Sequence, residues 1–310
     1  MMSRFRTVVC ALTLTGALTL TGCTIGSQER ADGGDQARGT STVTLTSTLG
    51  SQPDGNLPPA ASEPTEPTEE QETDGIAGQL QVAVDQTIAA YGGTAGIATS
   101  DGTSEVTAGD MTPAAAWSTI KVPIAIAALR NDPSQAPTVA AAIQWSDNSA
   151  AETLWATLGT PEQAGIATGA VIAEGGSALR VNTIVTRSPF TSFGQTLWSP
   201  TDQARFAANL PCISGSGPVL ESMGRVQADQ SWGIGQLPGA RFKGGWGPKP
   251  DGSYSARQFG LSTDPATGQT RAIAIIVDPG SGTFADATAM ANTLIAAAQS
   301  AIQQAPTVLC

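Results

Sequence analysis

A long apolar stretch headed by a lysine is the feature that most constrains how this chain can fold. Residues 122–129 are all apolar or proline, and they follow directly on Lys121. A helix that is apolar on every side is buried, so this stretch predicts a core helix. Burying an ammonium is costly unless the group is paired or loses its proton. Ser118 lies three residues earlier, on the same face of a helix, so the spacing predicts that Lys121 removes the proton of Ser118 and makes it a nucleophile.

The absence of histidine limits the kinds of catalytic site that this chain can form. A Ser-x-x-Lys spacing arises by chance about once in a chain of this size, so it decides nothing alone. The 310 residues include no histidine, which excludes Ser-His-Asp and Cys-His sites and imidazole metal ligands. Any serine nucleophile must take its base from Lys, Glu, Asp or Tyr. Without histidine the cysteines are too few for a zinc site, and we expect no metal and no other cofactor.

Charge is unevenly distributed along the chain. The net charge is −11, and the ten acidic and two basic residues between positions 24 and 75 contribute −8 of it. An acidic chain without basic runs has no electrostatic footprint for nucleic acid. We therefore expect a small-molecule or peptide ligand rather than a nucleic acid, and a monomer, since no feature signals an oligomer.

The N-terminus resembles that of a bacterial lipoprotein. Arg4 and Arg6 precede an apolar run at 7–20 that is too short for a typical membrane span, and Leu20-Thr21-Gly22-Cys23 resembles a lipobox. The resemblance implies that residues 1–22 are a signal peptide and that Cys23 carries acyl chains such as palmitate. These would anchor the protein on the extracytoplasmic face of the bacterial cell membrane. The alternative is an ordinary signal peptide cleaved nearby.

Composition divides the rest of the chain into a tether and a domain. Residues 24–74 are rich in Ser, Thr, Gly, Pro, Asp and Glu, so they cannot bury enough apolar surface to fold. With Cys23 they form a predicted acidic tether, 23–74, that precedes a domain at 75–310. Cys212 and Cys310 lie in that domain, and two cysteines in an exported domain most simply form a disulfide. Two buried free thiols are the alternative.

The domain predicts an α+β fold. Strand patterns lie early and late, helical patterns lie between them, and a helix is expected near each end, so both ends of the domain should share one sheet. The Asp101-Gly102 pair is a strong hairpin signal. The expected helices cover 80–91, much of 138–237 and 284–303, and the expected strands cover 95–100, 104–108, 241–243, 254–262 and 271–277.

Two further motifs follow Ser118 in a fixed order. Ser146-Asp147-Asn148 precedes a helical pattern and could simply cap that helix, whereas Lys243-Gly244-Gly245 ends a predicted strand. The whole chain has three lysines, Lys121, Lys243 and Lys249, and two of them complete these motifs. Their order resembles the SxxK, SDN and KTG elements of serine β-lactamases and penicillin-binding proteins.

The resemblance is strongest to class A β-lactamases and covers about residues 76–303, including the approach to the third motif at 232–248. It implies a β-lactamase-like fold: an antiparallel five-stranded sheet flanked by terminal helices, plus a reduced helical lobe. It also implies that Ser118 attacks an acyl carbonyl, with Lys121 as base or proton relay. Ser146 would pass a proton to the leaving nitrogen, and Lys243 would bond Ser146 and attract a substrate carboxylate.

The remaining implied roles concern substrate binding. Asn148 would hold the substrate's side-chain amide, and Gly245 belongs to the strand that borders the substrate. The backbone amides of Ser118 and Trp246 would form the oxyanion hole, where preorganised donors contribute several kcal/mol in the transition state. Arg257 stands where some class A enzymes keep a carboxylate-binding arginine. Its alternative is a rim arginine paired with an acid.

Three departures from the class A pattern limit these implications. The third motif is KGG, which lacks the threonine hydroxyl, and the bulkier Trp246 can narrow the cleft. Fewer residues separate SxxK from SDN, which predicts a smaller lobe and a more open cleft. No ExxLN glutamate follows Asn148: the nearest acids are Glu162 and Glu174, and the plausible loop at 180–199 has none. An acyl-enzyme formed here is therefore expected to persist.

The sequence favours a membrane-anchored serine acyl-transfer hydrolase that acts on β-lactam or peptidoglycan-peptide-like amides. The alternative from another class is a binding lipoprotein of the cell envelope that keeps the fold and has lost productive catalysis. A purely structural lipoprotein would leave both lysine motifs unexplained.

Overall fold

The computed structural model describes residues 69–310, with side chains from Gly75 onward. The predicted signal peptide, Cys23 and the tether up to residue 68 lie outside the described residues and stay predictions. Helix α1 (Glu69–Tyr91) begins six residues before the expected start of the domain. None of the helices described combines the length and hydrophobicity needed to span a membrane.

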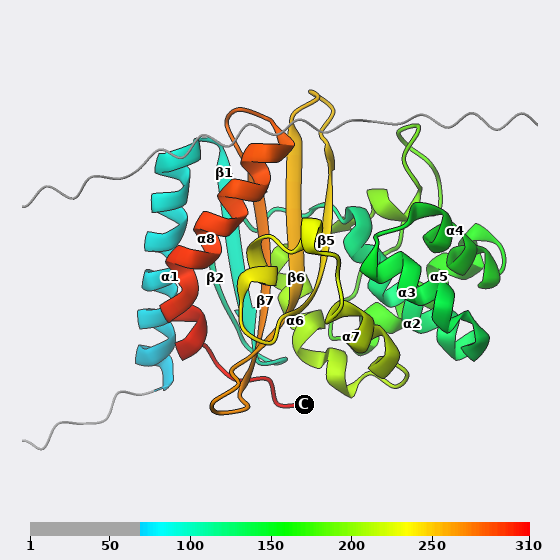
Figure 1. Ribbon diagram of the computed structural model, residues 1–310, viewed down its shortest axis with the longest axis horizontal. Coiled ribbons are helices and arrows are strands. Elements are labelled where there is room, and N and C mark those ends of the chain that lie inside the picture. The colour runs from blue at the N-terminus through cyan, green and yellow to red at the C-terminus, as the bar shows by residue number, and fades with distance from the viewer. Residues whose placement is uncertain (1–68) are drawn as a thin grey trace, which may run out of the picture. The chain divides into compact units, whose positions relative to one another are not determined.

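The centre of the domain is an antiparallel five-stranded sheet, as expected (Figure 1). Its spatial order is β2-β1-β7-β6-β5, so strands from both ends of the domain lie side by side. Strand β5 is an edge strand that pairs only with β6, and this leaves its other edge open to the helical lobe. The strands are β1 (Thr94–Ser100), β2 (Glu105–Gly109), β5 (Arg241–Pro248), β6 (Tyr254–Thr263) and β7 (Thr270–Asp278).

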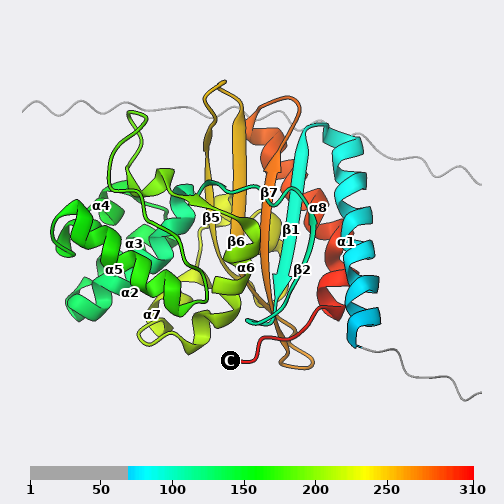
Figure 2. The same ribbon diagram turned by 180° about the vertical axis from the view of Figure 1, so that it is seen from behind.

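Helices cover both faces of the sheet. Helices α1 and α8 (Phe284–Gln304) lie side by side on one face, and α6 (Pro200–Asn209) lies on the other (Figures 1 and 2). Alternation along the strands explains the two layers, because successive side chains point to opposite faces. In β6, for instance, Ala256 packs toward α8 while Phe259 packs in the core shared with α6.

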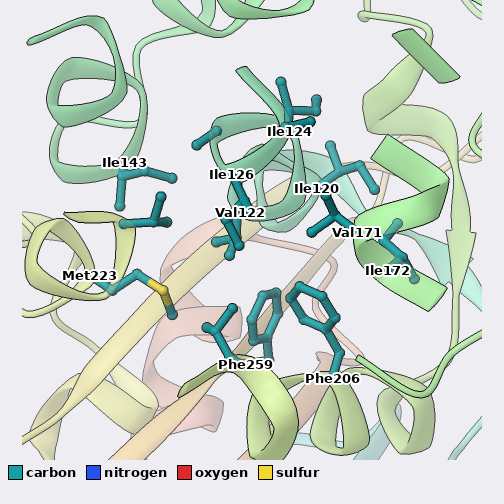
Figure 3. Close-up of a cluster of buried hydrophobic side chains, with 14 of the residues drawn as sticks. Ile120, Val122, Ile124, Ile126, Ile143, Val171, Ile172, Phe206, Met223 and Phe259 are labelled. Atoms are coloured by element: carbon teal, nitrogen blue, oxygen red, sulfur yellow. The ribbon is translucent and has the colours of Figure 1, made fainter. Parts of the chain in front are cut away.

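The helical lobe is built around α2 (Lys121–Asn131), in which residues 121–129 are all buried. The prediction of a core helix at 122–129 is confirmed. Figure 3 shows Val122, Ile124 and Ile126 packed among side chains from neighbouring helices and from β6. Burying each such side chain contributes about 1.5–3 kcal/mol. The other helices of this region are α3 (Ala136–Gln144), α4 (Asn148–Thr157), α5 (Pro161–Glu174) and α7 (Gly217–Met223).

Helix starts follow from capping side chains. Thr160 and Gln163 form a reciprocal capping box at α5, while Ser199 and Thr283 cap α6 and α8. Each cap satisfies a backbone N–H that has no partner inside its helix. Asp147 caps α4 by accepting from Ala150 N at 2.9 Å. The SDN tripeptide is therefore a helix cap as well as part of the candidate site.

Several short elements were not expected from the sequence. Strands β3 (Ala114–Ala115) and β4 (Leu197–Trp198) form a two-residue antiparallel ladder beside the main sheet. Short 3₁₀ turns are η1 (Trp117–Ile120), η2 (Pro133–Gln135), η3 (Phe193–Gln195), η4 (Leu210–Cys212), η5 (Ala228–Gln230) and η6 (Gly233–Gln236). Ladders and turns of this length leave no period that a sequence pattern can reveal.

A disulfide joins Cys212 and Cys310, whose Cα atoms are 5.6 Å apart. This confirms the disulfide and rules out two free thiols. The tail after α8 runs back along the sheet, where Val308 N donates to Thr270 O at 2.9 Å. The bridge closes a loop across 98 positions, so it restricts the unfolded chain over a long stretch.

Candidate active site

Ser118 lies in the short turn η1, immediately before α2. Its side chain is half-buried, and among the described residues no hydrogen bond engages its hydroxyl. The preceding residue, Trp117, has φ +50°, in the left-handed region. Such a conformation costs a non-glycine residue about 1–3 kcal/mol and persists only where surrounding contacts impose it. The predicted nucleophile therefore follows a strained residue.

Lys121 opens α2 with its ammonium directed at the SDN segment. Its Nζ donates to Ser146 O at 2.7 Å and to Asn148 Oδ1 at 2.7 Å, and it lies 3.4 Å from Ser146 Oγ. These three acceptors belong to residues 25 and 27 positions further along the chain. The structure thus brings the first and second motifs together, although Lys121 makes no direct hydrogen bond to Ser118.

Burial sets the protonation state of Lys121. The side chain is almost fully buried, and this desolvation lowers its pKa to about 8, although the charges of Asp147 and Glu152 act in the opposite direction. No carboxylate contacts its ammonium among the described residues. A pKa near 8 leaves about a tenth of the lysine neutral at pH 7, which is the form that can accept a proton.

Lys243 reaches the same serine from strand β5. Its Nζ donates to Ser146 Oγ and to Gly244 O, both at 2.9 Å, and the side chain has no exposed surface. Burial, followed by the charge of Lys121, holds the pKa of Lys243 well below its usual range. Ser146 itself has φ +55°. The lysine cluster, as we call Lys121, Ser146, Asn148 and Lys243, therefore assembles from three separate motifs around one hydroxyl.

Strand β5 approaches the Ser118 turn so closely that only glycine fits at its nearest point. A Cβ on Gly245 would lie 2.8 Å from both Ala116 O and Ser118 N. A Cβ on Gly247 would lie 2.6 Å from the indole of Trp117. The two glycines let the third motif lie against the turn, and they bring the Ser118 amide beside the backbone that precedes Trp246.

The two faces of β5 have different surroundings. Lys243 and Gly245 face the Ser118 turn, whereas the Trp246 ring packs on the opposite face against Trp232 and Phe284. The expected narrowing of the cleft by Trp246 is therefore wrong, because its ring is not inserted between β5 and Ser118. Its backbone N–H remains the predicted oxyanion-hole donor.

Gly244, which replaces the threonine of KTG, shares that opposite face, and its surroundings leave little room for a larger side chain. A Cβ at Gly244 would lie 3.3 Å from Trp232 Cζ2. That contact is tighter than ordinary van der Waals packing, so a larger side chain would require the Trp232 ring to move. The glycine in place of the KTG threonine and the Trp232 ring thus pack directly against each other.

Arg257 corrects a second expectation. Its side chain has no exposed surface, and it donates to Gln203 Oε1 at 2.8 and 3.1 Å, to Trp198 O at 2.8 Å, and to the carbonyls of Ala114 and Ala115 at 2.9 and 3.1 Å. Burial lowers its pKa to about 9. Every donor is engaged within the protein, so neither the predicted carboxylate-binding role nor the rim ion pair holds. A guanidinium has five N–H donors, and these contacts use all of them.

The segment between α5 and β4, residues 175–196, returns to the turn from the other side. We call it the 175–196 loop. The guanidinium of Arg187 lies over the rings of Trp117 and Phe190, with its Cζ 5.5 and 4.6 Å from their centroids, and it also donates to Pro248 O. Trp117 and Phe190 meet edge to face at 5.2 Å. This aromatic clamp joins the loop, the turn and the end of β5.

The loop brings no carboxylate to the lysine cluster, because it contains no Asp or Glu. The two nearest acids in sequence are placed elsewhere. Glu174 forms a bidentate pair with Arg130 at 2.6 and 2.7 Å, and this pairing lowers its pKa. Glu162 is an exposed residue in the first turn of α5. Neither contacts Ser118, Lys121 or Ser146.

Sequence reasoning missed several residues that shape the site. Trp117, Arg187 and Phe190 form the clamp, and Gln203 bridges Arg257 to Thr119. The one available signal was the position of Trp117 directly before Ser118. Nothing in the pattern of α6 distinguishes Gln203 from an ordinary surface glutamine.

Comparison with known proteins bears on the fold. No protein-family model matches the sequence, and no curated protein matches it. Solved structures do: a class A β-lactamase from Bacteroides cellulosilyticus is 17% identical with a TM-score of 0.59, over 74% of this chain and 98% of that one. A β-lactamase from Streptosporangium roseum is 15% identical with a TM-score of 0.58, over 74% and 100%. A class A β-lactamase from Mycobacterium abscessus is 16% identical with a TM-score of 0.56, over 72% and 99%.

At these low identities the likeness indicates a shared fold. It covers nearly the whole of each solved chain. It agrees with the α+β architecture and the antiparallel five-stranded sheet of this chain. This chain therefore has the fold of the serine β-lactamases.

Proposed function

We propose that this protein is a membrane-anchored serine acyl-transfer hydrolase that acts on β-lactam or peptidoglycan-peptide-like amides and deacylates slowly. Ser118 is the nucleophile. The observation that supports this most directly is the lysine cluster, in which Ser146 Oγ lies 3.4 Å from Lys121 Nζ and 2.9 Å from Lys243 Nζ. Burying two ammonium groups beside one hydroxyl is unfavourable for stability, so a catalytic role explains their retention.

The cluster suits the first half of an acyl transfer. Neutral Lys121 takes the proton of Ser118, and Ser118 Oγ forms a bond to the acyl carbon. The amide C–N bond then breaks, and a proton passes from Lys121 through the Ser146 hydroxyl to the leaving nitrogen. Lys243 orients that hydroxyl and attracts the substrate carboxylate. The backbone amides of Ser118 and Trp246 receive the developing oxyanion.

The second half of the reaction lacks an obvious base. Hydrolysis of the acyl-enzyme needs a water that loses a proton as it adds to the ester. No carboxylate contacts the lysine cluster within residues 75–310, and the 175–196 loop has none to offer. The proposal of slow deacylation rests on this absence, since general bases contribute about 10²–10⁴-fold.

The membrane anchor is a separate part of the proposal. It rests on the lipobox-like Leu20-Thr21-Gly22-Cys23 and on the polar composition of residues 24–74. Metabolic labelling with an alkyne-bearing palmitate tests it. Label should appear on the wild-type protein and disappear when Cys23 is replaced by alanine.

Intact-mass labelling tests the acyl-transfer proposal. The domain is incubated with penicillin and, separately, with a fluorophosphonate, and the mass of the protein is measured. An adduct on the wild type that is absent from Ser118→Ala supports a lysine-activated nucleophile. No adduct with either reagent would contradict it and would favour a binding protein that has lost catalysis.

A further inference from the structure

A buried chain of hydrogen bonds runs behind the Ser118 turn. Gln203, on α6, has no exposed surface, and its Oε1 accepts from Arg257 at 2.8 and 3.1 Å. Its Nε2 donates to Thr119 Oγ1 at 2.8 Å. The Thr119 hydroxyl in turn donates to Ala116 O at 2.5 Å. The chain therefore links the sheet, α6 and the turn that carries the nucleophile.

The direction of every bond in this chain is determined. Arginine can only donate, so the carbonyl oxygen of Gln203 must face Arg257 and its NH₂ group must face Thr119. The Thr119 hydroxyl accepts from that NH₂ group and is left to donate to Ala116 O. A buried network with one consistent arrangement holds its groups in a single geometry.

The chain ends at a strained part of the backbone. Ala116 O also accepts from Thr119 N at 3.1 Å, which closes the turn around Trp117 and Ser118. Trp117, at φ +50°, lies inside that turn. Arg257 reaches the segment before it as well, through the carbonyls of Ala114 and Ala115. Gly245 of β5 approaches the same carbonyl, Ala116 O.

We infer that Gln203 is a positioning residue which, through Thr119, fixes the Ala116 carbonyl and so orients the hydroxyl and backbone amide of Ser118 for acyl transfer. The inference rests on the proposed function for its catalytic consequence. Gln203 does not touch a substrate: it acts on the turn that carries the reacting group. Arg257 serves the same turn by holding the amide of Gln203 in one orientation.

Two variants of Gln203 separate positioning from general stability. Gln203→Met keeps the size of the side chain and removes its three hydrogen bonds, two with Arg257 and one with Thr119. Gln203→Glu keeps the acceptor for Arg257 and gives it a carboxylate partner, but the ionised side chain has no donor for Thr119. The Thr119 hydroxyl can then turn toward the carboxylate and leave Ala116 O.

The chain offers a matched control on the opposite face of the sheet. Gln258 also has no exposed surface, and it bridges Trp232 O and Ile234 N. Gln258→Met removes two buried hydrogen bonds to backbone groups, and these bonds do not reach the Ser118 turn. All variants are compared below the lowest melting temperature of the set.

The first readout is the second-order rate of labelling of Ser118 by a fluorophosphonate. We expect both Gln203 variants to label about 10–100-fold more slowly than the wild type, because small misplacements of reacting groups have effects of this size. Gln203→Glu should do so without a fall in melting temperature. Gln258→Met should melt lower and label at close to the wild-type rate. Wild-type labelling in both Gln203 variants would overturn the inference.

The second readout does not depend on catalysis. Hydrogen exchange is followed in peptides that cover residues 112–121 and, for comparison, β7. Both Gln203 variants should exchange faster at 112–121 with β7 unchanged, whereas Gln258→Met should not. If exchange at 112–121 stays at the wild-type level, Gln203 does not hold the turn. If the wild type takes no label while exchange changes as expected, the proposed enzymatic function fails and the positioning of the turn stands.

Discussion

The lysine cluster and the 175–196 loop lie on two sides of the Ser118 turn, and they are built in opposite ways. The cluster joins three motifs through charge-assisted hydrogen bonds, with two buried ammonium groups and, in the part of the chain that the structure describes, no carboxylate in contact. The loop meets the turn through a cation–π and aromatic clamp of Arg187, Phe190 and Trp117. The contrast suggests that one side is equipped to move a proton, while the other only holds the turn in place.

Acyl transfer requires both activation of a serine and activation of a water. The cluster provides groups for the first step, since the pKa of Lys121 is lowered to about 8. The loop has no ionisable acid for the second. We therefore regard the two halves of the reaction as separable in this protein, and the following predictions test that separation in order of decreasing effect.

The largest effect is expected from removing the proton acceptor. Lys121→Met should lower the rate of acylation by penicillin by about 10²–10⁴-fold, the usual contribution of a general base. Time-resolved intact-mass measurement gives the rate. Lys249→Met is the matched control, because Lys249 is partly exposed and pairs with Asp278 at 3.3 Å. Equal rates in Lys121→Met and Lys249→Met would show that the cluster does not move the proton.

The second prediction concerns the loop side. Once excess penicillin is removed, the acyl-enzyme should decay about 10²–10⁴-fold more slowly than one with a positioned base. The adduct is followed by mass, and its release by hydroxylamine checks that it is an accessible ester. Steady turnover of a chromogenic cephalosporin at ordinary enzyme rates, about 1–10³ s⁻¹, would contradict slow deacylation. It would show that the site activates a water as well as a serine.

The third prediction uses the two faces of β5. Gly245→Ala places a methyl group 2.8 Å from two backbone atoms of the turn, so the strand and turn must separate, and acylation should fall about 10²-fold. Gly244→Ala meets no backbone atom: its methyl group lies 3.3 Å from the Trp232 ring and 3.6 Å from the Gln258 side chain. We expect it to lower the melting temperature slightly and to change the acylation rate far less. Similar losses in both variants would mean that the approach of β5 to Ser118 is unimportant.

The smallest expected effect is on pH dependence. Neutral Lys121 is the proposed base, and burial lowers its pKa to about 8. Its neutral fraction therefore rises about tenfold between pH 7 and pH 9 and then levels off, and labelling by a fluorophosphonate should follow. A reagent without a carboxylate is needed because the lowered pKa of Lys243 weakens carboxylate binding as pH rises. A flat profile would exclude Lys121 as the titrating base.

Much of the fold could be predicted because local sequence patterns determine the main helices and strands. The strands at 95–100, 254–262 and 271–277, the all-apolar helix after Lys121 and the closing amphipathic helix all leave local apolar patterns, and the structure confirms these elements. The disulfide was also predictable. The β3–β4 ladder and the 3₁₀ turns were not, because elements of two to four residues are fixed by their neighbours.

Some parts of the candidate site were predicted correctly from the sequence and others were not. The assembly of Lys121, Ser146 and Lys243 was expected from motif order, and the structure brings them together. Arg257 was expected to face a substrate, but four carbonyl and amide oxygens around it satisfy all its donors. Its position in β6 was predictable, whereas the acceptors that capture it come from β3, β4 and α6, which lie far away in sequence.

The sequence by itself determined the residue types of the candidate site, the absence of an imidazole and the lack of an acid in the 175–196 loop. These are facts of composition and order that folding cannot alter. Only the tertiary structure decided that the Trp246 ring points away from the Ser118 turn and that Arg257 is fully buried. It also decided that Gln203 hydrogen-bonds Thr119 behind Ser118. Such outcomes depend on which distant polar groups meet in the core, because a buried donor must find its acceptor wherever the fold supplies one.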